Sequence, residues 1–72
     1  MFDKEEVYEV LELIYEYNLP PTISDIKNEL LMDEIKVQMI LNLLYEYDII
    51  DEYNKPVKNY NNALLIIDKI NF

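Results

Sequence analysis

Carboxylates are the side chains in this sequence most able to do chemistry. The chain has 15 Asp and Glu residues against six Lys, no Arg and no His, which gives a net charge of −9. Four of the glutamates have the spacing of one helix face, and we call them the acidic stripe: Glu5, Glu9, Glu12 and Glu16. Carboxylate pairs at this spacing bind metals in helical bundles, but together with histidines and from several helices. We therefore expect a solvated face, with docking of a basic protein or imitation of nucleic acid as alternatives.

The residues that most enzymes use are missing. Without His or Cys there is no acid–base group poised near neutral pH, no thiol nucleophile, no disulfide and no Cys/His zinc site. The only serine, Ser24, has no imidazole to activate it, and a chain without glycine cannot form either common type of phosphate-binding loop. The sequence predicts that the protein is not an enzyme, and we expect no catalytic residue, no cofactor, no metal and no small-molecule substrate.

The periodicity of the apolar residues predicts three helices, over residues 3–17, 22–31 and 33–47. Apolar side chains recur at helical spacing on one face of the first helix and of the third: Val7, Val10, Leu11 and Ile14, then Val37, Ile40, Leu41 and Leu44. Thr22 and Asp25 have the spacing of a capping box, and Asp33 is the expected N-cap of the third helix.

Two similar words, LIYEYN at 13–18 and LLYEYD at 43–48, mark the ends of the first and third helices. Each ends in an Asx residue that tolerates a left-handed conformation, which helix ends need when glycine is missing. After Asp48 the pattern changes, and residues 49–53 and 63–70 favour strands on either side of a segment rich in turn-forming residues. Residues 1–72 are expected to form one α+β domain.

This order of elements resembles the winged helix-turn-helix superfamily. The residues that carry the resemblance match the second helix, the turn and the third helix of that fold: Ile26, Leu30, Met32, Asp33, Val37, Leu41 and Leu44. Asp48-Ile49-Ile50 stands where the family commonly has Gly-Leu-Ile, so Asp48 in place of the glycine is a departure from the family pattern. The resemblance implies three helices followed by a two-stranded β-hairpin wing, and a third helix that recognises DNA.

The outward face of the third helix is the predicted contact face for a partner, and it consists of Ile35, Gln38, Met39 and Asn42. Ile35 and Met39 are apolar on a face that should be wet, which favours a protein partner. The apolar run at 63–67 offers a further face that the first helix, a partner or a second copy could cover, and Tyr8 and Tyr15 are of a type enriched in interfaces.

DNA is the alternative partner. Gln38 and Asn42 have the amides that read adenine edges, and Lys36, Lys55, Lys58 and Tyr60 would then contact the backbone from the helix and the wing. Few lysines are available to contact the DNA backbone, however, and the net negative charge of the chain repels phosphate groups.

No stretch of about 18 apolar residues is present, and no signal peptide is recognisable, so we expect a cytoplasmic protein that does not cross a membrane. The predicted function is that of a small non-catalytic winged-helix regulatory or adaptor module, which binds a protein, including a second copy of itself, in preference to DNA.

Overall fold

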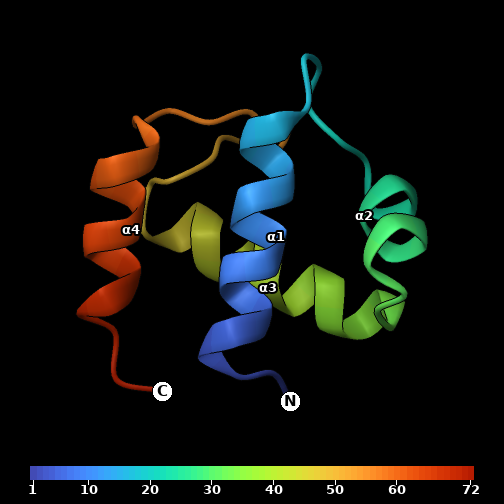
Figure 1. Ribbon diagram of the computed structural model, residues 1–72, viewed down its shortest axis with the longest axis horizontal. Helices are drawn as coiled ribbons and strands as arrows, with labels where there is room; N and C mark the ends of the chain where they lie inside the picture. The colour runs from blue at the N-terminus through green and yellow to red at the C-terminus, as the bar shows by residue number, and fades with distance from the viewer.

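Four α-helices make up the structure, and no strand accompanies them. The computed structural model describes all 72 residues and places the helices at Lys4–Glu16 (α1), Ile23–Leu30 (α2), Glu34–Glu46 (α3) and Tyr60–Asp68 (α4). Figure 1 shows α1 between α2 on one side and α4 on the other, with α3 crossing behind. The fold is therefore all-α.

The first three helices confirm the positions predicted from the sequence, and each begins at a side-chain cap. Asp3 and Glu6 form a capping box at the start of α1. At α2, Asp25 N donates to Thr22 Oγ1 over 3.1 Å and Thr22 N donates to Asp25 Oδ2 over 2.9 Å, which is the predicted capping box. The carboxylate of Asp33 accepts from two amides of α3. These bonds satisfy N–H groups that have no partner within the helix.

A single apolar cluster fills the space between the helices, and no polar side chain is buried in it. The predicted inward residues of α1 and α3 are all in this cluster, which confirms the helical phase on which the site predictions depend. Its members are Val7, Val10, Leu11, Leu13, Ile14, Ile26, Met32, Val37, Ile40, Leu41, Leu44, Ile49, Ile50, Ala63 and Ile67.

The predicted wing is wrong. Residues 49–53 form no strand, and most of 63–70 belongs to α4; the only β contact is one antiparallel bridge between Ile50 and Pro56. The α+β winged helix-turn-helix fold is therefore corrected to an all-α fold. The physical reason is that Asn59 caps a helix by accepting from Asn62 N over 2.8 Å, and that the following apolar run fits a buried helix as well as a strand.

The segment between α3 and α4 is a turn-rich loop that closes the core. Asp48 adopts the expected left-handed conformation, with φ of 58°. The carboxylate of Asp51 accepts from the amides of Tyr53 and Lys55, as in an Asx turn. Asn18, in contrast, does not take the left-handed conformation expected of it, because the chain leaves α1 extended at Tyr17.

Two tyrosines of α1 form hydrogen bonds at the two ends of α4. Tyr15 Oη donates to the carbonyl of Lys58 over 2.7 Å, just before α4 begins, and Tyr8 Oη donates to the carboxylate of Asp68 where α4 ends. The rings of Phe2 and Phe72 then meet edge to face, with centroids 6.1 Å apart. Tyr8 and Tyr15, which suggested an interface from the sequence, thus have an intramolecular role.

Candidate partner-binding surfaces

The outward face of α3 is exposed as predicted, and a residue of the preceding turn extends it. Ile35 is 71% exposed and Met39 is 37% exposed. Leu31, the C-cap of α2 and four residues before Ile35, is 91% exposed. Leu31, Ile35 and Met39 recur every four residues, and we call them the apolar seam. The sequence prediction included Ile35 and Met39 but missed Leu31.

Leu31 lies in a conformation that leucine disfavours. It ends α2 with φ of 53° and ψ of 44°, the left-handed region, which suits glycine or asparagine. For a residue with a Cβ atom this conformation costs roughly 1–2 kcal/mol. Its exposed side chain takes no part in the core cluster. Neither the turn nor the core therefore accounts for a leucine at this position.

Gln38 and Asn42 lie beside the seam and form a hydrogen bond with each other. Gln38 Nε2 donates to Asn42 Oδ1 over 2.9 Å. Both line a hollow of about 220 Å³ together with Tyr45, Asp51 and Glu52. The hollow thus offers amides and a phenol, but its two carboxylates would repel the phosphates of an approaching nucleic acid.

The residues predicted for DNA binding do not form one basic surface. Lys36 Nζ lies 2.7 Å from Glu6 Oε2, and this ion pair ties α3 to α1. The hydrogen bond from Lys36 holds the pKa of Glu6 below its usual value, and the same bond raises the pKa of Lys36. Lys55 is exposed and Lys58 half-buried in the loop before α4, while the ring of Tyr60 packs edge to face against Tyr15. Lys55, Lys58 and Tyr60 are therefore not on a wing.

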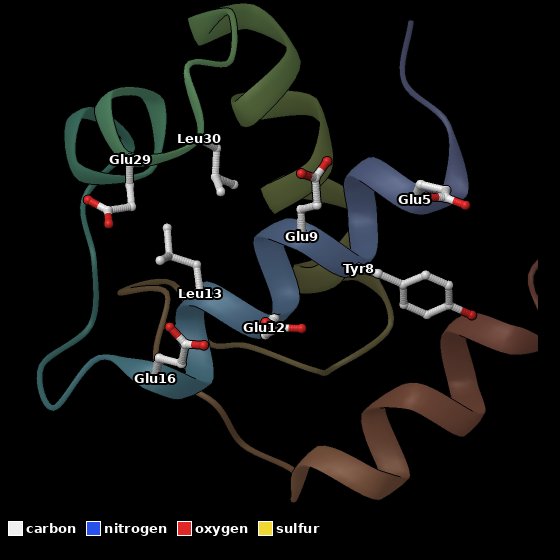
Figure 2. Close-up of a pocket in the computed structure, with 8 residues that line it drawn as sticks. All are labelled: Glu5, Tyr8, Glu9, Glu12, Leu13, Glu16, Glu29 and Leu30. Atoms are coloured by element: carbon white, nitrogen blue, oxygen red, sulfur yellow. The ribbon is translucent and has the colours of Figure 1, made fainter.

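The acidic stripe is exposed and forms one side of a groove. The groove has a volume of about 510 Å³, and Glu29 of α2 faces the four stripe glutamates across it. Figure 2 shows Leu13 and Leu30 pointing toward one another between the two helices, while Tyr8 points toward α4. No lysine lines the groove, and none of its five glutamates forms an ion pair.

No group of three or more carboxylates is arranged to hold a metal ion. None of the four helices combines the length and the apolar character that crossing a membrane requires.

A comparison with models of protein families, a search of curated proteins and a search of solved structures each gave no significant match. Function must therefore be inferred from the surfaces themselves.

Proposed function

We propose that this domain is a non-catalytic protein-binding module whose apolar seam contacts the partner. The observation that carries this proposal is Leu31, an exposed leucine held in a left-handed conformation. Glycine would lower the energy of that turn, so retaining leucine costs native stability without a gain in core burial. Local strain of this kind tends to be retained where the residue serves function.

The seam has the chemistry of a small protein-docking surface. Ile35 and Met39, one turn apart on α3, match two of the anchor positions with which helices occupy grooves in their partners, and Leu31 adds an apolar side chain from the turn before that helix. Met39 adds a flexible side chain that adapts to the shape of a partner. Gln38 and Asn42 lie beside these anchors and supply the hydrogen-bonding groups typical of an interface rim.

The charge of the domain favours a partner with basic residues around its apolar docking site. Glu29 and Leu30 line the acidic groove, and Leu31 follows them directly in the chain as the first residue of the seam. The groove therefore places uncompensated negative charge next to the seam. Such a field accelerates association with a basic protein and slows association with an acidic one.

A protein partner is preferred to DNA because of the residues that surround Gln38 and Asn42, the two side chains predicted to contact base edges. Asp51 and Glu52 share the hollow of Gln38 and Asn42, and Lys36 is already paired with Glu6. A duplex on this face would have to overcome two carboxylates and break an ion pair before it gained a phosphate contact.

Site-specific photo-crosslinking in the host cells tests the proposal. A benzophenone side chain at position 35 should give a discrete adduct with another protein. The same group at Leu19, which is 77% exposed in the loop after α1, is the matched control and should not. Met39→Glu in the chain that carries the position-35 probe should abolish the adduct.

Equal labelling from positions 35 and 19, or no adduct from position 35, would refute the proposed surface. Fluorescence anisotropy with a mixed-sequence DNA duplex at about 50 mM salt tests the DNA alternative, because even non-specific DNA-binding proteins remain bound at that salt concentration. DNA binding that is lost in Gln38→Ala or Asn42→Ala would replace the protein proposal with the DNA alternative.

A further inference from the structure

Helix α4 has more apolar surface than its neighbours cover. Ala63 and Ile67 are fully buried, yet Leu65, on another side of the same helix, is 57% exposed. Leu64 and Ile66 are half-buried. Of the other helices only α1 packs against α4, which lies at the edge of the molecule in Figure 1. The exposed sides of α4 also carry Asn61, Asn62 and Asp68, so its uncovered apolar surface consists of Leu65 and the half-buried Leu64 and Ile66.

A shallow hollow lies next to the exposed leucine. Its volume is about 530 Å³, and it is lined by Val57, Lys58, Asn59, Asn62, Leu65 and Ile66. The same surface therefore presents a projecting apolar side chain and a recess whose lining is half apolar and half polar. Two such surfaces related by a two-fold axis complement each other, since each leucine can enter the recess of the other copy.

Charge singles out this face for contact between two copies. All 15 acidic residues lie outside residues 53–67, a segment that contains Lys55 and Lys58. A contact through the acidic groove would set glutamates against glutamates in a chain of net charge −9. In an antiparallel pair of α4 helices, Lys58 of each copy lies near the C-terminal end of the other α4, where Asp68 and the negative end of the helix dipole attract it.

We propose that two copies of this chain associate through α4 in an antiparallel, two-fold arrangement centred on Leu65. A stable interface buries about 800 Å² of each partner, which is about a sixth of this chain's accessible surface of 4855 Å². The interface proposed here is smaller than that. Helix α4 has nine residues and is about 13.5 Å long, so we expect a weak dimer with a dissociation constant of roughly 10–500 µM. The face lies across α1 from α2, so it is separate from the start of the seam.

Sedimentation velocity from about 10 µM to about 1 mM protein measures this association. The dimer fraction should rise with concentration, and it should not fall when salt is raised from about 0.15 M to about 0.5 M, because salt screens the repulsion between two acidic chains. Leu65→Glu should remain monomeric at concentrations where the wild type is half dimeric. Leu19→Glu is the matched control and should dimerise like the wild type, and circular dichroism should show both variants folded.

A charge-pair rescue tests the two-fold geometry. Leu65→Glu and Leu65→Lys should each be monomeric alone, whereas their equimolar mixture should dimerise, because the axis brings position 65 close to its counterpart. A wild type that stays monomeric at about 1 mM, a Leu65→Glu variant that dimerises normally, or a mixture that stays monomeric would each overturn the proposal. Ile35→Glu should leave the dimer intact, so failure of the seam and failure of this face are distinguishable.

Discussion

Replacing Leu31 by glycine should make the domain more stable. The left-handed conformation costs a residue with a Cβ atom roughly 1–2 kcal/mol, and glycine adopts it without that cost. Glycine also gives the unfolded chain more freedom, which opposes folding by about 0.4–1 kcal/mol. Because the leucine side chain is 91% exposed, its removal loses little burial. The net expectation is a gain of about 0.5–1 kcal/mol, or about 2–8 °C in Tm for a domain of this size.

Urea unfolding followed by far-UV circular dichroism measures this difference as a shift in the urea concentration at half-unfolding, with the m-value unchanged. Leu19→Gly is the control, since Leu19 is also an exposed leucine but has no positive φ angle. It should lose about 0.4–1 kcal/mol, so that the two substitutions act in opposite directions. The Leu31→Gly variant should also give weaker crosslinking from position 35. If the variant is less stable than the wild type, or if it crosslinks from position 35 as strongly as the wild type does, then Leu31 is not a residue kept for binding at a cost in stability.

Three further predictions concern the helices and their caps. Ile67→Ala should destabilise the domain by about 2–5 kcal/mol in urea unfolding because it leaves a cavity under α4, and a loss below about 0.5 kcal/mol would contradict the docking of that helix. Thr22→Ala removes the α2 cap and should cost about 1 kcal/mol, whereas Thr22→Ser should be nearly neutral. Glu6→Gln keeps an acceptor for the α1 capping box but loses the charge that pairs with Lys36. Since the folded-state pKa of Glu6 lies below its usual 4.5, the ion pair stabilises the fold above that pH and is lost as pH falls through the lowered pKa. The Tm difference between Glu6→Gln and the wild type should therefore be present at neutral pH and vanish in acid; a difference independent of pH would exclude the ion pair as its cause.

The first three helices could be predicted because several local signals agree there. In α2, the Thr22–Asp25 capping box fixes the start, and a buried Ile26 fixes the inward face. In α3, Asp33 fixes the start and the apolar spacing fixes the phase. When cap and periodicity agree, the inner and outer faces follow, which is why Gln38 and Asn42 were placed on the outside correctly.

Helix α4 was missed because its apolar run satisfies two patterns. A short run with isoleucines at 66 and 67 has the composition of a strand, and its periodicity does not distinguish a strand from a buried helix. The signal that could have found the helix is the Asn59 cap followed by Ala63 and Ile67 one turn apart. Asp48 and Ile49 looked like the exit into a wing, but the left-handed turn there leads into a loop instead.

The candidate surfaces were predictable only in part. The exposure of Ile35 and Met39 followed from the phase of α3, but the strained conformation of Leu31 depends on how the chain passes from α2 to α3 and has no local signature. The hollow beside Leu65 required the fold of α4, and the groove of the acidic stripe required the position of Glu29 on α2. Composition set the charge of each surface; only the fold brought its residues together.

The contact between Phe2 and Phe72 brings the start of α1 and the end of α4 to the same side of the molecule, as Figure 1 shows. A domain whose two ends lie close together can be inserted into a surface loop of a host protein without disrupting the host's own structure. The same proximity allows those residues to be joined by a short linker and new ends opened in the loop at 51–55, giving a circularly permuted chain with the four helices in a different order.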